Sequence, residues 1–599
     1  MSRLLLRLLV LAATAPLVTA CGGGGASHGT PAVLPQSVQT VAPQLPSALT
    51  GVPQTALRGV LVSVQLPLRN SDELDTLIAN QADEHSPAYR HFLTPEQFRD
   101  RYAPAAADLN AAAATLQAAG YETRVTSQTI LAAASQPIVE RSFGVRLQQT
   151  NARNRTLLSA DRAPILSAAL TKLGASVTFS RFLYHTNSKR VERTSLGQDN
   201  RYGADGPYWF TDLKEAYGYP SYRALNGAGR TIAIVISSDI RDSDLAKYFG
   251  HEGLARIPTV VRRPVNGGPP PFDVNSPDSD EASLDVQQSL GSAPGASLIL
   301  YDIPDLSDQN ILAGYQAVVD ENRADIVSSS FGLCELYYTK AYNDGVDYTP
   351  LLRSYNNVFR QGNAQGITFV ASSGDNGALD CTDPSGTVLV KGVENPADDP
   401  NVTAVGGTNL VTASVTGSKN SRYAGENAYF DALDPAQGAL PNQIWGSGGG
   451  ISELFKKPWY QGLVETRARM RTVPDIAMHM GGCPLGSLPC GPDRTSVVTA
   501  IGGSFYRLIG TSASAPEFAG LLAVTEQSLG TRLGNANGYI YSLAAIFGNR
   551  VYRHPPGNNG YPTRRDYDYV LGNGTPHAAA FALRPGIPLA GDPGTPSNP

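Results

Sequence analysis

The stretch Gly510-Thr511-Ser512-Ala513-Ser514-Ala515-Pro516 has the composition of a tight turn between a strand and a helix. It follows residues 496–509, which are rich in β-branched and glycine residues, and precedes the helix-forming run 517–529. Pro516 is expected in the first helical turn, where its missing N–H costs no hydrogen bond. Ser512 is therefore expected at a helix N-terminus, where free N–H groups stabilise an anion beside a nucleophilic oxygen. The alternative is an ordinary capping serine.

A serine nucleophile in an α/β protein normally has a histidine as its base. The chain has eight histidines, and none lies in a glycine-rich or acidic segment typical of such a triad. His251 and His479 are the candidates for a histidine-based triad, but no His-Gly-Thr-His-like segment accompanies either. Carboxylates are therefore the better candidates for the base.

Two carboxylates, Glu281 and Asp285, are four residues apart and would share one face of a helix. Neighbouring carboxylates share a proton, which raises one pKa and permits acid–base chemistry. A solvated helix face is the simpler interpretation of this pair. Asp375, within Ser-Ser-Gly-Asp-Asn-Gly, is also typical of a turn. Each motif nevertheless lies where a predicted strand ends or a predicted helix begins.

The composition is that of a globular protein with several domains. The chain has 599 residues, 42% hydrophobic and 17% charged, which is too long for one core. Its net charge of −5 gives no basic surface of the kind that binds nucleic acid.

The N-terminus, residues 1–21, has the pattern of a secretory signal peptide, with arginines before a short apolar run. Val18-Thr19-Ala20-Cys21 is similar to a bacterial lipobox, so we expect Cys21 to carry a lipid anchor; a plain signal peptide is the alternative. Residues 22–54 are rich in Ser, Pro, Gln and Thr and are expected to form a flexible linker. The predicted location is therefore secreted or in a bacterial cell envelope.

Residues 55–186 are predicted to form a small α+β domain with helices on one face of an antiparallel, ferredoxin-like sheet. The predicted strands are 60–66, 121–126, 129–134 and 145–150, and the predicted helices are 71–83, 94–102, 105–119 and 138–143. The polar segment 187–206 is then an exposed connector, where proteolytic cleavage concentrates. This order indicates a propeptide; an ordinary two-domain protein is the alternative.

Residues 207–577 alternate short apolar strands with helices, which indicates a parallel α/β sheet. The predicted strands are 231–236, 297–301, 325–330 and 368–372, and the predicted helices include 283–290, 310–322 and 348–365. Ligands of such sheets bind beyond the carboxyl ends of the strands. Residues 578–599 are expected to form a loose Pro/Gly-rich tail.

Besides Cys21, the chain contains four cysteines, and an even number in an exported protein suggests two disulfides. Three pairings are possible; we favour Cys334–Cys381 with Cys483–Cys490. A zinc site is the rival interpretation, but Cys-x6-Cys without nearby histidine suits structural zinc poorly.

Three motifs together, Glu281-x-x-x-Asp285, Ser-Ser-Gly-Asp375 and Gly-Thr-Ser512-x-x-x-Pro, resemble the sedolisins, which are serine-carboxyl peptidases. Supporting matches lie at residues 328–332, 405–408, 448–452 and 473–475, and residues 86–98 resemble the family's pro-kumamolisin-type activation domain. The resemblance covers residues 55–577. It implies a subtilisin-like fold and hydrolysis of protein or peptide substrates in acid.

The resemblance also implies a role for each site residue. Ser512 attacks the peptide carbonyl, Glu281 is the general base and later the acid, and Asp285 hydrogen-bonds Glu281. Asp375 joins the Ser512 N–H in the oxyanion hole, which requires Asp375 to be protonated. A carboxylate base suits low pH, where histidine would be protonated.

The family's C-terminal calcium site is expected to be degenerate here. Asp568 occupies one acidic position, but Arg553 occupies the other, and an arginine offers no oxygen ligand. We therefore predict that Arg553 pairs with Asp568 in place of the ion, and no cofactor is expected to be needed for the chemistry.

The sequence thus predicts a monomeric, self-processing zymogen of an acid-acting serine-carboxyl endopeptidase, with its own propeptide as intramolecular inhibitor and foldase. A tripeptidyl aminopeptidase of the same family is one alternative. A catalytically inactive envelope binding protein is the other.

Overall fold

The computed structural model describes residues 56–585 except 153–154, 180–181, 195–205, 255–256, 415–420, 429, 433–439, 465, 467 and 483–494. All described residues belong to one compact unit. The predicted signal peptide with Cys21, the linker 22–54 and the Cys483–Cys490 pair lie outside them. Within the described residues, no helix combines the length and hydropathy that crossing a membrane requires.

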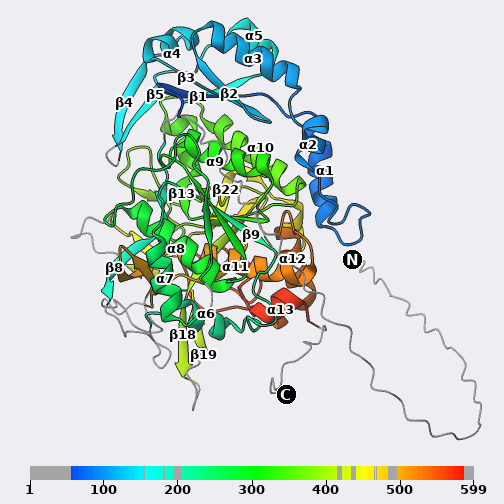
Figure 1. The fold of residues 1–599 in the computed structure, drawn as a ribbon, viewed down its shortest axis with the longest axis vertical. Helices are drawn as coiled ribbons and strands as arrows, with labels where there is room; N and C mark the ends of the chain where they lie inside the picture. The colour runs from blue at the N-terminus through cyan, green and yellow to red at the C-terminus, as the bar shows by residue number, and fades with distance from the viewer. Residues whose placement is uncertain are drawn as a thin grey trace, which may run out of the picture. The chain divides into compact units, whose positions relative to one another are not determined.

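The first domain is an antiparallel sheet covered by helices. Its elements are β1 (Val60–Gln65), α1 (Ser71–Ala82), α2 (Pro95–Arg101), α3 (Ala106–Ala118), β2 (Glu122–Val125), β3 (Thr129–Ala134), α4 (Gln136–Phe143), β4 (Leu147–Ala152), β5 (Arg155–Ala160), α5 (Ala168–Lys172) and β6 (Ser176–Phe179). The strand order is β2-β3-β1-β6, and α3, α4 and α5 lie on one side of these strands (Figure 1). Thr94 caps α2 through a reciprocal bond with Gln97.

One predicted strand of this domain has a different partner. The strand expected at 145–150 is observed as β4, but it pairs only with β5 in a separate hairpin, and β6 is the fourth strand of the sheet. The sequence pattern shows that a segment is extended, whereas the partner of a strand depends on the path of the chain.

The second domain is a mainly parallel sheet with helices on both faces. Its main elements are α6 (Phe210–Tyr217), β9 (Thr231–Ile236), α7 (Asp242–His251), β10 (Val260–Arg262), α8 (Pro277–Ser292), β11 (Ser297–Asp302), α9 (Asp308–Glu321), β12 (Ile326–Ser329), β13 (Phe331–Cys334), α10 (Thr349–Ala364), β14 (Thr368–Ser372), β17 (Glu394–Asn395), β18 (Val402–Ser414), β19 (Ser421–Asn427), β24 (Ile476–His479), β25 (Val497–Ile501), β26 (Ser504–Ile509), α11 (Thr511–Leu529), α12 (Asn537–Phe547) and α13 (Ala578–Leu583). The strand order is β10-β11-β9-β12-β14-β18-β19, with β24 also paired to β18. Among the described strands of this sheet, only the β18–β19 pair is antiparallel.

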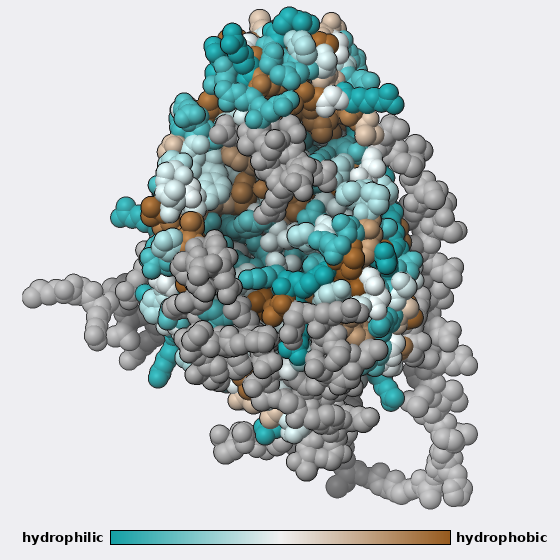
Figure 2. Space-filling view, turned by 90° about the vertical axis from the view of Figure 1, so that its left-hand side faces the viewer, coloured by the Kyte–Doolittle hydropathy of each residue, from teal (hydrophilic) through white to brown (hydrophobic). Residues whose placement is uncertain are grey.

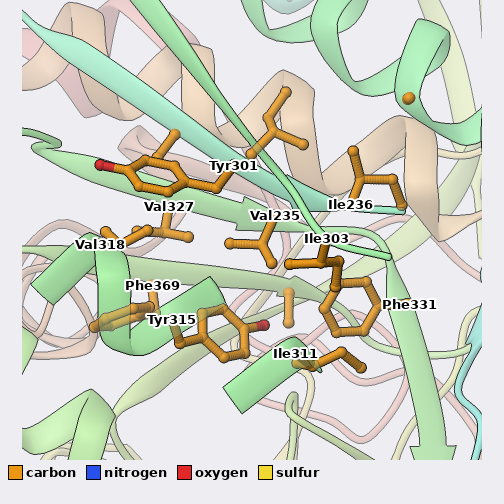
Figure 3. Close-up of a cluster of buried hydrophobic side chains, with 14 of the residues drawn as sticks. Val235, Ile236, Tyr301, Ile303, Ile311, Tyr315, Val318, Val327, Phe331 and Phe369 are labelled. Atoms are coloured by element: carbon orange, nitrogen blue, oxygen red, sulfur yellow. The ribbon is translucent and has the colours of Figure 1, made fainter. Parts of the chain in front are cut away.

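The two faces of this sheet pack into different cores because side chains alternate along each strand. On β14, Phe369 belongs to the core with α9, whereas Val370 belongs to the core with α11. Figure 3 shows the first of these cores, where Val235 and Val327 of the sheet meet Tyr315 of α9. The helices α8 and α11 pack against each other, which brings the predicted site residues together.

Two further features concern the second domain. A disulfide joins Cys334 and Cys381, as predicted. Residues 578–583, predicted as part of a loose tail, instead form α13, and Phe581 is fully buried. The composition indicates a tail, but the small apolar residues of this segment pack against α11 and thereby fold.

On the face shown in Figure 2, hydrophilic residues dominate and hydrophobic residues form small groups.

The two domains meet through polar contacts on α9 and α10. Ser127 Oγ donates to Gln361 Oε1 at 2.9 Å, and Arg360 Nε pairs with Asp75 Oδ1 at 2.7 Å. Gln81 Nε2 also donates to the Ala364 carbonyl at 3.1 Å. Polar interfaces of this kind are typical of partners that separate.

Candidate active site

Ser512 is the second residue of α11, at a sharp turn from β26. Gly510 caps this helix with φ 138°, a conformation that a residue with a Cβ rarely adopts. The position of Ser512 at a helix N-terminus therefore follows the prediction. The expectation for Pro516 is wrong: it lies inside α11 rather than in the first turn. The helix begins earlier than the proline suggests, because its first turn is fully buried against the core.

Glu281 and Asp285 lie one turn apart on α8, and both are completely buried. The structure thus excludes the solvated helix face that such a pair usually indicates. Ser330 Oγ donates to Asp285 Oδ1 at 2.6 Å. Burial raises the pKa of Asp285 to about 8, although the bond from Ser330 opposes this shift.

Burial also raises the pKa of Glu281 well above its usual value, and the neighbouring charge of Asp285 raises it further. Ser188 and Ser512 oppose the shift, because their side chains face the Glu281 carboxylate. Neither Glu281 oxygen has a hydrogen bond of ordinary geometry within the described residues. The Ser512 hydroxyl instead donates to the Ser330 carbonyl at 3.2 Å, so a small rotation would redirect it to Glu281.

Asp375 follows β14 and lies beside the start of α11. Its Oδ1 accepts bonds from both the N–H and the hydroxyl of Thr511, each at 2.8 Å. Burial raises the pKa of Asp375 well above its usual value, whereas the bonds from Thr511 lower it. The nearby Asp380, also buried, has its pKa raised to about 7. At acid pH, Asp375 therefore carries a proton that it can donate to an oxygen.

The two candidate histidines have other partners. His251 stacks on Trp209 at 3.9 Å and pairs with Glu252. His479 is buried; its Nδ1 accepts the Leu410 N–H at 3.1 Å, and burial lowers its pKa to about 3. Neither histidine has a contact with Ser512 among the described residues. The expectation of a carboxylate base agrees with this arrangement.

Sequence reasoning missed three residues that contact the site: Asn187, Ser188 and Ser330. The Ser512 N–H donates to the Asn187 carbonyl at 3.0 Å, and the Asn187 N–H donates to the Ser330 carbonyl at 3.1 Å. Ser330 belongs to a motif that matched the family, but its contact with Asp285 was not predicted. No local pattern marks Asn187 or Ser188, because the connector has neither apolar periodicity nor a known motif.

The residues at the expected calcium site do not fit the ion. The Asp568 carboxylate accepts three N–H groups of its own loop, from Arg564, Val570 and Leu571, at 2.8–2.9 Å. No cluster of three acidic, histidine or cysteine residues that could hold a metal occurs in the described part of the chain. Backbone N–H groups already occupy the Asp568 carboxylate oxygens, so these oxygens would be poor ligands for an ion.

The predicted pairing of Arg553 with Asp568 is wrong. The Arg553 guanidinium lies 4.3 Å from the centre of the Tyr423 ring and donates to the Pro576 carbonyl at 3.1 Å. The nearby aromatic face and carbonyl satisfy the arginine, while backbone N–H groups satisfy the aspartate.

The arrangement joins a nucleophile, a pair of buried carboxylates that share a proton, and a protonated carboxyl group beside a helix N-terminus. Acyl transfer needs each of these functions: a base that later acts as an acid, and donors for the oxyanion. All of them lie where α8, β14 and α11 meet. Local sequence identified the four carboxyl and hydroxyl groups, and the fold brings them together.

Two family models and several known proteins match this chain. Residues 53–175 match the family model described as the pro-kumamolisin activation domain, and residues 275–537 match the subtilase family. Xanthomonalisin of Xanthomonas sp. (strain T-22) is 27% identical over 557 residues, covering 87% of this chain and 64% of the relative. Kumamolisin of Bacillus sp. (strain MN-32) is 27% identical, covering 84% and 86%. The chain thus spans less than two thirds of xanthomonalisin.

Sedolisin of Pseudomonas sp. (strain 101) is 26% identical, covering 86% of this chain and 83% of the relative. The solved structure of Pseudomonas sedolisin, a serine-carboxyl proteinase complexed with pseudo-iodotyrostatin, has 26% identity and a TM-score of 0.52, covering 63% of this chain and 98% of that one. The chain therefore has a pro-kumamolisin-type activation domain followed by a subtilase-family domain, and it is similar along most of its length to sedolisin, a serine-carboxyl proteinase, and to kumamolisin and xanthomonalisin.

Proposed function

We propose that the protein is the self-processing zymogen of an acid-acting serine-carboxyl endopeptidase. The observation that carries this proposal is the path of the connector. The chain that follows the activation domain lies across Ser512, with the Asn187 carbonyl 3.0 Å from the Ser512 N–H. A backbone carbonyl in this position is bound as a substrate carbonyl would be.

The chemistry would begin with attack of Ser512 Oγ on a peptide carbonyl. Glu281, in the singly ionised pair with Asp285, takes the hydroxyl proton and returns it to the leaving amine. The oxyanion is stabilised by the Ser512 N–H and by protonated Asp375. Activity should therefore fall as pH rises through the raised pKa of Asp375, because the ionised carboxylate repels the oxyanion.

The connector favours endopeptidase over tripeptidyl-peptidase action. A tripeptidyl peptidase requires a cleft that ends three residues before the cleaved bond. Here the chain on that side continues past His185: the Tyr184 N–H donates to the Leu306 carbonyl at 2.9 Å, and Leu183 bridges to Ser307. A cleft that holds at least five residues accepts internal segments of a protein. Tripeptidyl-peptidase action is the alternative, because the chain is also similar to Tripeptidyl-peptidase sed5 of Aspergillus fumigatus.

On sequence alone, we further propose export through the segment 1–21 and anchoring at Cys21, so that removal of the activation domain would release the peptidase from the membrane. A monomer and chemistry without a cofactor complete the proposal.

The test compares wild type with Ser512→Ala and Glu281→Gln between about pH 3 and about pH 7. The substrates are a denatured protein and a long N-terminally acetylated peptide. Hydrolysis of both by wild type only is expected, with loss of at least about 1000-fold in either variant. Cleavage restricted to free N-termini in steps of three residues would support the tripeptidyl peptidase. Absence of hydrolysis at every pH would support a binding protein.

A further inference from the structure

The connector between the two domains lies in the cleft as an extended chain on both sides of Ser512. On the N-terminal side of the point where the connector passes Ser512, β7 (His185–Thr186) pairs antiparallel with β13. On the C-terminal side of that point, β8 (Lys189–Thr194) pairs antiparallel with β26. The peptide bond between Asn187 and Ser188 is therefore the bond presented to the catalytic serine.

The backbone contacts define this register. Asn187 donates its N–H to the Ser330 carbonyl and offers its own carbonyl to the Ser512 N–H. A Cβ on Gly510 would lie 2.2 Å from the Asn187 oxygen and 2.9 Å from the Ser188 Cα, so only glycine lets the chain approach this closely. The same absent Cβ would lie 2.9 Å from Asp375 Oδ2, so the proposed oxyanion donor borders the same point.

We propose that activation cleaves the Asn187–Ser188 bond, and that Glu394 and Ser372 make the enzyme selective for an amide side chain on the acyl side of the cleaved bond. This inference rests on the proposed peptidase function. It adds the position of the processing site and the chemistry of the residue that the enzyme prefers in substrates.

The side chain of Asn187 enters a buried polar pocket. Its Nδ2 donates to Glu394 Oε2 at 2.9 Å and to Ser372 Oγ at 3.0 Å. Asn187 is 1% exposed, and Glu394 and Ser372 are completely buried. An apolar side chain here would leave buried polar groups without a donor, which is costly, whereas asparagine supplies two N–H groups. The pocket is thus complementary to an amide.

Glu394 also contacts a second residue of the connector. His185 Nε2 lies 3.0 Å from Glu394 Oε1. Residues two apart in an extended chain point to the same side, so one carboxylate faces both His185 and Asn187. A peptide with a cationic residue two positions before asparagine should therefore bind best.

On the leaving side, Arg190 holds the chain. Its guanidinium pairs with Asp280, the neighbour of Glu281, and lies 3.9 Å from the centre of the Tyr506 ring. It also donates to the Val274 carbonyl at 2.8 Å. These contacts keep Ser188 beside Glu281, which must protonate its amine as the bond breaks.

The step balances without any further reactant than water. The Ser512 Oγ–carbon bond to Asn187 forms, the carbon–nitrogen bond to Ser188 breaks, and the hydroxyl proton passes through Glu281 to the Ser188 amine. Water then hydrolyses the ester, which releases the Asn187 carboxylate and restores Ser512.

The first experiment maps the cleavage of the wild-type precursor in acid by intact mass and N-terminal sequencing. Ser188 is the expected new N-terminus. Asn187→Leu should slow cleavage at this bond by roughly 10- to 100-fold. Lys172→Gln, a change at an exposed residue of α5 outside the connector, should leave the rate unchanged. A different N-terminus, with active enzyme, would overturn this inference and leave the proposed function intact. No cleavage of the connector or of added substrates would overturn the proposed function itself.

The second experiment measures specificity with peptides that differ only in the residue before the cleaved bond. Mature wild-type enzyme should cleave the asparagine peptide with a higher kcat/KM than the leucine peptide. Glu394→Ala should lower this ratio by roughly 10- to 100-fold. Both peptides are measured with the same enzyme preparation. Partial unfolding of a variant therefore lowers both kcat/KM values equally and leaves their ratio unchanged. An unchanged ratio would overturn the role of Glu394.

Discussion

At the scale of single residues, Asp375 shows how burial changes the function of a carboxyl group. An exposed aspartate is ionised at pH 4 and above and would repel an oxyanion. Asp375 is almost fully buried, and its raised pKa keeps it a hydrogen-bond donor in acid. The bonds from Thr511 occupy Oδ1 and leave Oδ2 toward Gly510 and the Asn187 carbonyl.

Replacing Asp375 with asparagine should remove the decline in activity at higher pH. An amide keeps an acceptor for Thr511 and a donor for the oxyanion but does not ionise, so kcat/KM should stay level where the wild-type value falls. Asp375→Ala should instead lower kcat by about 100- to 1000-fold at all pH values, since the donor is lost. The measurement is the pH profile of kcat/KM on one peptide. A decline that persists in Asp375→Asn would assign it to another group.

At the scale of elements, a buried aspartate and a nearby arginine in the C-terminal loops each have their own partners. The loop 564–571 folds around the Asp568 carboxylate, and Arg553 lies across Tyr423 at a different place. Burial raises the pKa of Asp568 to about 6, but its backbone N–H donors oppose that shift. The carboxylate therefore organises its own loop.

Calcium should accordingly have little effect on stability. With Ser512→Ala protein, in which the proposed self-processing is blocked, chelator or added calcium should change Tm by less than about 1 °C. Arg553→Ala should lower the free energy of unfolding by about 1 kcal/mol, because the contact with Tyr423 is lost. The control Arg550→Ala changes an exposed arginine of the same region. A rise in Tm of several degrees with calcium would show that an ion binds after all.

At the scale of the whole molecule, buried carboxylates should make the fold most stable in acid. Burial raises the pKa of Asp302 to about 8 and that of Asp308 and Asp380 to about 7. In the unfolded chain these groups titrate near 3.8. The folded protein therefore binds more protons between these values, and its stability is lost as pH rises through the folded pKa.

The Ser512→Ala protein should thus have its highest free energy of unfolding near about pH 4, with a steady fall toward about pH 8. Asp302→Asn should reduce the fall by an amount of the order of a few kcal/mol, because the amide does not ionise. The measurement is denaturant unfolding at a series of pH values. Equal pH dependence in both proteins would mean that Asp302 does not contribute.

Local sequence patterns predict most elements of the fold and the residues of the site. The strands 231–236 and 368–372 and the strand-to-helix turn at Ser512 follow from apolar periodicity and turn residues, which act within a few neighbours. The types and order of Glu281, Asp285, Asp375 and Ser512 resemble the sedolisin motifs, and that resemblance implies acyl transfer.

Which distant residues meet depends on the fold of the whole chain, and the structure shows these contacts. It placed Asn187 on Ser512, more than 300 positions away in the chain, and gave Asp285 its bond from Ser330. It also gave Arg553 and Asp568 different partners, and it paired β4 with β5 instead of with the four-stranded sheet. Such contacts depend on the path of the whole chain, and a polar connector has no local pattern that reveals where it lies. The bond that the enzyme is proposed to cut first is therefore visible only in the fold.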